Sequence, residues 1–317
     1  MIKDIFLFGS GLVILFYGAR WLVNGASNIA IYWGIRPIIV GLTIVSFGTS
    51  LPELVVSIIA ALKGAKDIAL GNIIGSNIAN IGLVLGLSAI IRPLHIKNQT
   101  IKKDIPIMIA VSLLLYYLAW DLIIDSFDGI ILFVGIILFV TYCVYNARTN
   151  KESTKETLED IKHCLNHNHN LSVRYELVMT IIGIGGVILG ADIMVRAASS
   201  IARAVGLSEL FIGMTIVAVG TSLPELATSV AAAYLRKMEI SVGNVIGSNI
   251  FNICMVIGMV SIVSPLHIER LVLQREMIIM LLFSLVIFPL MLPRRLLTRT
   301  NGVFLVIGYI AFILYCI

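Results

Sequence analysis

The sequence is short of charged residues. Only 13% of its 317 residues are Asp, Glu, Lys or Arg, and 59% are hydrophobic. A water-soluble domain has about 25% charged residues, so this chain has too few to cover a soluble surface. The composition excludes an ordinary soluble domain and predicts a protein surrounded by lipid. The net charge of +5 includes no basic cluster with interleaved aromatics, so nucleic acid is not an expected partner.

Cysteine and histidine are also scarce, and their spacing is uninformative. The four cysteines, Cys143, Cys164, Cys254 and Cys316, lie far apart, which argues against a disulfide framework and a zinc site. Three histidines and a cysteine (His163, Cys164, His167, His169) lie close together in a polar segment. We interpret this segment as a solvated loop rather than a metal sensor. The first apolar run lacks a basic leader and a cleavage site, so we interpret it as a membrane span. We expect no cofactor, no obligate protein partner and no enzymatic activity.

Ten apolar stretches are long enough to cross a bilayer, which takes roughly 20 helical residues. They lie near 4–32, 37–62, 68–91, 105–124, 127–146, 174–202, 209–235, 240–263, 276–293 and 302–316. The one sizeable polar segment, 147–172, separates two sets of five. The sequence therefore predicts an all-α membrane protein with an N-terminal half (1–146), a linker (147–172) and a C-terminal half (173–317).

The distribution of Lys and Arg predicts the orientation. Fifteen of these residues fall in loops on the side of the linker, and six fall on the other side. The six are Lys3, Lys63, Lys66, Arg203, Arg270 and Arg275. Because basic residues concentrate in cytoplasmic loops, we expect a multi-pass protein of the cell membrane with a cytoplasmic linker and both termini outside.

The chain contains a long internal repeat. Residues 17–96 align with 189–268 at a constant offset of 172, without gaps, and about half of the positions are identical. The strongest matches are GTSLPEL at 48–54 and 220–226, and GNIIGSNIAN at 71–80 with GNVIGSNIFN at 243–252. Corresponding segments are five spans apart, an odd number, so the copies should have opposite orientations in the membrane. Inverted repeats of this kind are typical of transporters with a central site.

Two glutamates occupy the middle of apolar spans. A charged group there costs at least ~2.5 kcal/mol on insertion scales, and Glu53 and Glu225 are repeat-equivalent. Further oxygen-bearing side chains share helix faces at a spacing of four. These polar stripes are Thr49, Glu53 and Ser57 with Ser46 and Ser50; Thr221, Glu225 and Ser229 with Ser222; Asn72, Ser76 and Asn80; and Asn244, Ser248 and Asn252. Interhelical hydrogen bonding explains some of them but does not explain two acids.

Prolines next to the glutamates predict a break in each helix. Pro52 has no N–H for the carbonyl of Gly48, and Pro224 has the same relation to Gly220. Freed carbonyls near 46–49 and 218–221 can point inward, because irregular backbone at membrane depth is tolerated where it lines a cavity.

Carboxylate, hydroxyl, amide and carbonyl oxygens, without thiolates or imidazoles, are the ligands of a hard cation. Two carboxylates balance one Ca²⁺, and the same oxygens can hold Na⁺ nearby. Competition for shared ligands is a sufficient basis for exchange. Two other classes remain open. A cation channel uses similar oxygens but favours a symmetric oligomeric pore. An intramembrane hydrolase needs a catalytic dyad or a metal cage.

At these motifs the sequence resembles the calcium/cation antiporter superfamily, in its sodium/calcium exchanger branch. The resemblance covers the whole chain and implies electrogenic exchange of several Na⁺ for one Ca²⁺ at four clustered sites. It implies that Glu53 and Glu225 ligate calcium together with the carbonyls of Thr49 and Thr221. The residues that match the flanking sodium sites are the hydroxyls of Thr49, Thr221, Ser50, Ser222, Ser76 and Ser248 and the carbonyls of Ser46 and Ala218.

One position departs from some members of that family. The central pair is Asn80 and Asn252, where potassium-dependent relatives tend to carry an acid, which weakens the case for K⁺ co-transport. The motif GTSLPE also differs from the GN-x-x-E pattern of proton-coupled relatives. Ca²⁺/H⁺ exchange and K⁺-dependent exchange remain the alternatives.

Three further charged residues lie nominally inside spans. Asp192 and Arg196 are four residues apart and should form an ion pair on one helix face. Arg20 lies in the first span. The resemblance implies that the first and sixth spans act as sliding gates. The alternative to a structural ion pair is therefore a contact that these charged residues make during gating.

Overall fold

The computed structural model describes residues 2–149, 172–204, 218–292 and 295–316, and these are almost entirely helical. The first half contains α1 (Ile2–Trp33), α2 (Pro37–Val40), η1 (Gly41–Val45), α3 (Ser46–Thr49), α4 (Leu51–Leu62), α5 (Lys66–Ala79), η2 (Asn80–Leu85), α6 (Gly86–Ile91), β1 (Leu94–His95), η3 (Thr100–Asp104), α7 (Ile105–Leu118), η4 (Ala119–Asp121), β2 (Ile123–Ile124) and α8 (Ser126–Thr149). The second half contains α10 (Val173–Ala204), α12 (Ala218–Thr221), α13 (Leu223–Tyr234), α14 (Met238–Phe251), η6 (Asn252–Ile257), α15 (Gly258–Val263), β3 (Leu266–His267), α16 (Arg270–Gln274), α17 (Glu276–Met291), β4 (Leu296–Leu297) and α18 (Arg299–Cys316).

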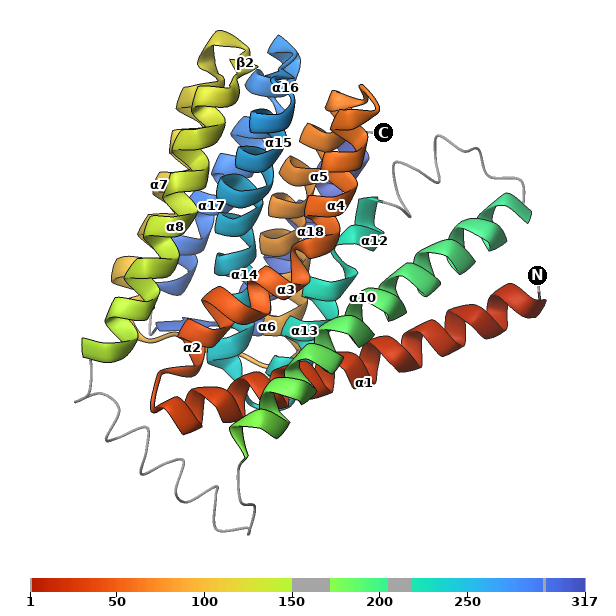
Figure 1. Ribbon diagram of the computed structural model, residues 1–317, viewed down its shortest axis with the longest axis vertical. Helices are drawn as coiled ribbons and strands as arrows, with labels where there is room; N and C mark the ends of the chain where they lie inside the picture. The colour runs from red at the N-terminus through yellow and green to blue at the C-terminus, as the bar shows by residue number, and fades with distance from the viewer. Residues whose placement is uncertain (1, 150–171, 205–217, 293–294, 317) are drawn as a thin grey trace.

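Two long helices form an oblique pair beside an upright bundle (Figure 1). These are α1 and α10, the first helix of each half. Their backbones approach closely where glycines meet: a Cβ added at Gly18 would lie 2.7 Å from backbone atoms of Gly186 and Val187. Small residues at such crossings let membrane helices pack through their backbones. The two helices therefore pack as one unit along their length.

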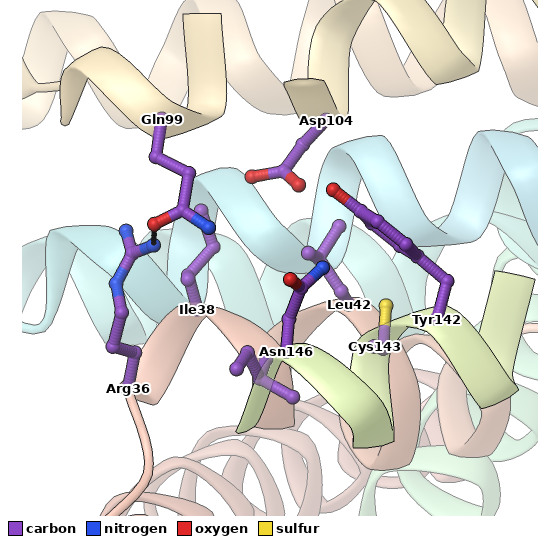
Figure 2. Close-up of a pocket in the computed structure, with 9 residues that line it drawn as sticks. Arg36, Ile38, Leu42, Gln99, Asp104, Tyr142, Cys143 and Asn146 are labelled. Carbon is purple, nitrogen blue, oxygen red and sulfur yellow. Dashed lines mark hydrogen bonds between the residues drawn. The ribbon is translucent and has the colours of Figure 1, made fainter. Parts of the chain in front are cut away.

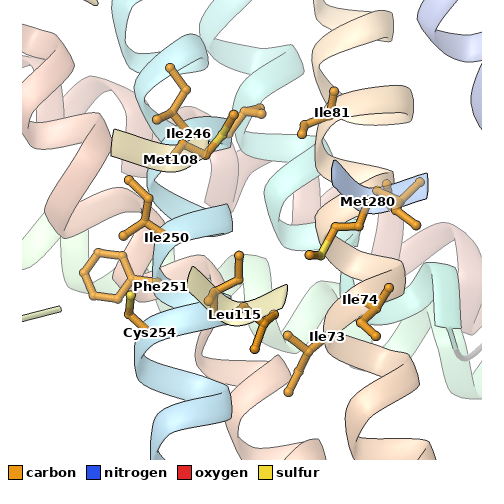
Figure 3. Close-up of a cluster of buried hydrophobic side chains, with 14 of the residues drawn as sticks. Ile73, Ile74, Ile81, Met108, Leu115, Ile246, Ile250, Phe251, Cys254 and Met280 are labelled. Atoms are coloured by element: carbon orange, nitrogen blue, oxygen red, sulfur yellow. The ribbon is translucent and has the colours of Figure 1, made fainter. Parts of the chain in front are cut away.

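The centre of the bundle is formed by two repeat-equivalent continuous helices. Of their membrane-spanning windows, 78% is buried in Lys66–Ile91 and 89% in Met238–Val263, against 28–33% in the other five long spans. Figure 3 shows part of the apolar packing around them, with Ile73 and Ile74 from the first half and Ile246 and Ile250 from the second. A polar group on these two central helices is therefore surrounded by protein rather than by lipid.

Short antiparallel strand pairs join the halves at the ends of the bundle. Strand β1 pairs with β4, Leu94 opposite Leu297, and β2 pairs with β3, Ile124 opposite Leu266. Each pair links a loop of one half to a loop of the other. The loops at 94–95 and 296–297 thus share one face of the bundle, and those at 123–124 and 266–267 share another.

The all-helical membrane fold is confirmed, whereas the count of ten spans remains a prediction. The described residues contain seven helices long and apolar enough to cross a membrane, one bent pair, Pro37–Thr49 with Leu51–Leu62, and a shorter apolar helix, Arg299–Tyr315. The start of the expected span 209–235 lies outside the described residues. Helix α8 continues through Thr149, past the expected start of the linker at 147. Most of that linker, with Cys164 and its neighbouring histidines, lies outside the described residues as well.

Candidate functional site

The site begins at a break in each copy of the GTSLPEL motif. Helices α3 and α4 meet at Ser50, whose φ of −83° and ψ of 2° interrupt the helix, and the chain bends there by 41°. Ser222 has nearly the same conformation, with φ −88° and ψ 4°. Pro52 and Pro224 follow as the second residues of α4 and α13, where a missing N–H is harmless. The prediction of a proline-associated break is confirmed in both copies.

The break places each glutamate in the first turn of a new helix. Glu53 is the third residue of α4 and Glu225 the third of α13. A helix N-terminus favours negative charge, because its free N–H groups and dipole point toward it. Both side chains are fully buried, and they are close enough for their charges to interact. Two acidic side chains, one from each half, are thus held together in the middle of the protein.

The carboxylates have few hydrogen-bond partners. Ser50 Oγ donates to Glu225 Oε1 across the two halves at 3.2 Å. Among the described residues, no hydrogen bond reaches either carboxylate oxygen of Glu53 or Oε2 of Glu225. A buried carboxylate without partners is costly, and protein carboxylates of this kind are normally paired or coordinate a metal. Three oxygens are therefore available to a cation.

Around the acids, hydrogen bonds between the halves repeat at the offset of 172. Thr49 Oγ1 donates to Asn244 Oδ1 at 3.2 Å, and Thr221 Oγ1 donates to Asn72 Oδ1 at 3.0 Å. The asparagine amides in turn donate to serines one helix away, Asn72 to Ser57 at 3.1 Å and Asn244 to Ser229 at 2.8 Å. The asparagines therefore orient the threonine hydroxyls of the opposite half.

The remaining hydroxyls of the stripes also meet across the halves. Ser222 lies 3.2 Å from Ser76, and Thr49 lies 3.4 Å from Ser248, oxygen to oxygen. These contacts come from the broken helices of one half and the continuous central helix of the other. Hydroxyls that the sequence separates by about 150 or 200 residues therefore surround the same interior space.

Both asparagines of the central pair begin a π-helical turn. Asn80 opens η2 and Asn252 opens η6, and both side chains are fully buried. Asn80 Nδ2 donates to Asn249 Oδ1 at 3.2 Å. Within the described part of the chain, Asn80 Oδ1 and both polar atoms of the Asn252 amide have no partner. Single π-turns inside helices occur frequently at functional sites. The amide oxygens are thus further free acceptors in a dry interior.

The predicted residues all fall on the two broken helices and the two central helices. Those whose side chains are described are buried: Ser46, Thr49, Ser50, Glu53, Ser76, Asn80, Thr221, Ser222, Glu225, Ser248 and Asn252. Ala218 is known as the first residue of α12. Asn72 and Asn244 lie on the predicted stripes, but helical spacing does not predict that they orient the threonines. Asn249 was not predicted, because it belongs to the repeated Ser-Asn pair but lies one position off the stripe.

A second polar cluster lies apart from the glutamates (Figure 2). Arg36, which immediately precedes α2, donates to the side chain of Gln99, and Asp104, Tyr142 and Asn146 line the same small pocket. The sequence did not predict this cluster, because its members come from three distant segments with no shared motif. It contains no free pair of carboxylates, so it resembles a structural contact between helix ends.

One expected ion pair is also present. Arg196 Nε lies 2.8 Å from Asp192 Oδ1 on the exposed side of α10. This confirms the predicted pairing at a spacing of four. Lys97 and Glu239 form a further ion pair of 2.7 Å, which joins the two halves near the ends of the central helices.

Comparison with known proteins agrees with this geometry. The family described as "Sodium/calcium exchanger protein" matches residues 3–149 and 175–317. The chain is 37% identical over 288 residues to Inner membrane protein YrbG of Escherichia coli, covering 90% of this chain and 87% of that protein. It is 30% identical over 333 residues to Sodium/calcium exchanger MaX1 of Methanosarcina acetivorans, covering 96% and 95%.

A solved structure is similar over nearly the whole length. The sodium-calcium exchanger NCX_Mj, soaked with Na⁺ and without Ca²⁺, superposes with a TM-score of 0.85 at 35% identity, and the match covers 98% of each chain. MaX1 and NCX_Mj are named as exchangers, which fits cation antiport rather than an enzymatic reaction. The chain belongs to the sodium/calcium exchanger family of the calcium/cation antiporter superfamily.

Proposed function

We propose that the chain exchanges Na⁺ for Ca²⁺ by alternating access through the central oxygen-lined site. The observation that supports this most strongly is the buried pair Glu53 and Glu225, one from each half, with three of their four oxygens unpartnered among the described residues. Two carboxylates match the charge of one Ca²⁺, and the surrounding hydroxyl and amide oxygens match its preference for hard ligands.

The two ions share parts of one ligand set in this proposal. Ca²⁺ binds between Glu53 and Glu225 with the carbonyls of Thr49 and Thr221, and Na⁺ binds beside it. The proposed sodium ligands are Ser46, Thr49, Ser50, Ser76, Ala218, Thr221, Ser222 and Ser248. The amide oxygens of Asn80 and Asn252 complete the centre. Because shared ligands cannot hold both ions at once, filling the sodium positions displaces Ca²⁺.

The inverted halves supply a physical route for alternating access. Exchanging the conformations of two inverted repeats converts an inward-open protein into an outward-open one around a fixed site. The closely packed pair α1 and α10 is the proposed moving element, because it lies beside the bundle rather than within it. We propose ten spans in this arrangement, with the linker 147–172 cytoplasmic between halves 1–146 and 173–317.

Ion fluxes in proteoliposomes test the coupling. Purified protein is reconstituted, and ⁴⁵Ca²⁺ uptake is measured with an outward gradient of Na⁺, of K⁺ or of protons. Uphill uptake driven by the Na⁺ gradient alone is expected. Uptake driven by a proton gradient without Na⁺ would overturn sodium coupling in favour of Ca²⁺/H⁺ exchange. A requirement for K⁺ would indicate the potassium-dependent alternative, and purely downhill flux would indicate a channel.

Cysteine labelling tests the orientation. A cysteine introduced at Lys155 in the linker should react only from the cytoplasmic side, and one at Lys66 only from outside. The test is made in a background lacking the natural cysteines, with an impermeant reagent applied to intact cells and to inverted vesicles. Labelling of both positions from the same side would contradict the proposed topology.

A further inference from the structure

A large apolar cavity lies away from the polar centre, between α1, α6 and α13. Its volume is about 820 Å³, and its walls are aliphatic and aromatic except for Arg20, the one charged side chain among the described residues that line it. Phe16 and Tyr234 belong to its lining and are 52% and 70% exposed. The cavity is therefore open to the surface of the molecule. Because this surface is apolar and lies on membrane-spanning helices, we expect it to face lipid.

The walls exclude a role as a cation pathway. A cation that leaves water needs replacement oxygens, and aliphatic side chains such as Leu87 and Val230 provide none. Of the helices that line the cavity, α13 also carries part of the proposed exchange site, but its Glu225 and Ser229 are fully buried and do not belong to the lining. The cavity is thus a separate feature of the molecule.

A comparison of equivalent positions in the two halves shows why this space is open. On α13, Ala227 and Ala231 line the cavity. At the offset of 172, the equivalent residues on α4 are the larger Val55 and Ile59, which are exposed on the outer surface of the first half. The two alanines lie one turn apart on α13 and are smaller than their equivalents. They therefore leave the space of the cavity open in the second half only.

The charge at the cavity also differs between the halves. Arg20 lies inside the long apolar helix α1, is exposed, and has no ion-pair partner among the described residues. Its repeat equivalent is Asp192, which pairs with Arg196 on its own helix. An unpaired charge at membrane depth is costly, so a basic side chain there extends toward an anion. Arg20 thus points to an anionic partner that the first half of the protein does not itself supply.

Further basic residues gather where the cavity helices end. Ile91 and Leu235 line the cavity, and the residues that follow them are Arg92 and Arg236. Basic residues between helices at one membrane face attract anionic lipid headgroups, each contributing about 1 kcal/mol.

We propose that this cavity binds one anionic phospholipid, with an acyl chain between α1, α6 and α13 and its phosphate at Arg20. The apolar walls match the chain, and the arginines match the headgroup. The proposal concerns lipid binding and does not depend on which ions the central site exchanges.

Lipid retention measured by native mass spectrometry tests the proposal. The delipidated full-length protein is mixed with phosphatidylglycerol or phosphatidylcholine carrying identical acyl chains. The wild type should retain one phosphatidylglycerol in preference to phosphatidylcholine. Arg20→Gln should reduce this preference about fivefold, the factor that one basic residue supplies, and Arg20→Lys should restore most of it. Val230→Phe should fill the cavity and reduce retention of both lipids.

Matched controls separate this site from the general lipid belt. Arg174→Gln removes an exposed arginine from α10, and Val55→Phe enlarges the exposed equivalent of Ala227; neither should change retention. Dihexanoyl phosphatidylglycerol, which has the headgroup but only short chains, should bind much more weakly. Equal retention of both lipids by the wild type, or an unchanged preference in folded Arg20→Gln, would overturn the proposal. Glycerol phosphate that competes as well as the full lipid would show a simple anion site instead.

Discussion

The internal repeat preserves the residues at the centre of the molecule but not those that line the cavity beside α1. At the centre, Glu53 and Glu225 are identical, and the hydrogen bonds of Thr49 and Thr221 are mirror copies at the offset of 172. At the cavity, the same offset relates Arg20 to a residue of opposite charge. A site used by both inverted halves must present the same ligands from each. A surface that meets one membrane leaflet has no such requirement.

The largest expected effect comes from removing charge at the symmetric centre. Glu53→Gln and Glu225→Gln should each reduce Na⁺-driven Ca²⁺ uptake about 100-fold or more, because losing one partner of a buried charge contact costs several kcal/mol. Uptake in proteoliposomes measures this, with size-exclusion profiles confirming the fold. Glu269→Gln, which changes an exposed acid in a loop, is the matched control and should transport normally. Near-normal uptake by either glutamine variant contradicts the two-glutamate site.

A smaller effect, equal in the two halves, should follow from removing one threonine hydroxyl. Thr49→Val and Thr221→Val should each weaken apparent Ca²⁺ or Na⁺ affinity by roughly tenfold, the worth of a hydrogen bond or ligand contact. The concentration dependence of uptake gives the affinity. If one substitution leaves the affinity unchanged and the other lowers it strongly, the two halves contribute unequally to ion binding, despite their equivalent hydrogen bonds.

Adding an acid tests whether the central asparagines face the same ions. Protons should compete with Ca²⁺ and Na⁺ for the two glutamates, so uptake should fall in acid. Asn252→Asp adds a third coupled group, and the decline of uptake with falling pH should become steeper. Asn80→Asp should behave alike. The measurement is uptake between about pH 5 and pH 9, with and without K⁺. Unchanged profiles in both variants would place these asparagines outside the ion site.

The last prediction concerns the periphery and the stability of the protein rather than its transport. Lys237, in the turn between α13 and α14, donates from Nζ to Asn24 of α1 at 2.7 Å. Burial lowers its pKa to about 8, and nearby Glu176 offsets part of that effect. The unfolded pKa is about 10.4, so the folded protein binds fewer protons between these values, and its stability should rise with pH there by roughly 3 kcal/mol at most.

Thermal unfolding in detergent at about pH 7.5 and pH 9.5 measures this dependence. The wild type should gain stability relative to Lys237→Met, which cannot titrate. A parallel response of the two proteins would show that Lys237 is not the responsible group.

Much of this structure follows from the repeat in the sequence. The offset of 172 predicted an inverted pair, and Pro52 and Pro224 predicted the breaks that place each glutamate at a helix start. The polar stripes predicted four helices with oxygen-rich faces. Helical periodicity fixes which residues share a face, so the stripes and the proline breaks depend on local sequence alone.

The remaining features depend on how distant segments meet. The pairing of Thr49 with Asn244 requires the rotation of one half relative to the other, which no local pattern encodes. Asn249 lies one position off the stripe on α14, and its place in the centre depends on its contact with Asn80 of the other half, which a spacing of four does not predict. The contact of Arg36 with Gln99 and the cavity at Arg20 likewise depend on packing between helices from different segments.

Equilibrium binding of ⁴⁵Ca²⁺ to the purified protein, titrated with Na⁺, tests the shared central site most directly. We predict one Ca²⁺ per chain, displaced steeply by Na⁺ because several sodium ions compete for its ligands, and no specific Ca²⁺ binding to Glu53→Gln/Glu225→Gln. Ca²⁺ binding that Na⁺ leaves unchanged, or that persists in the double variant, would contradict the account.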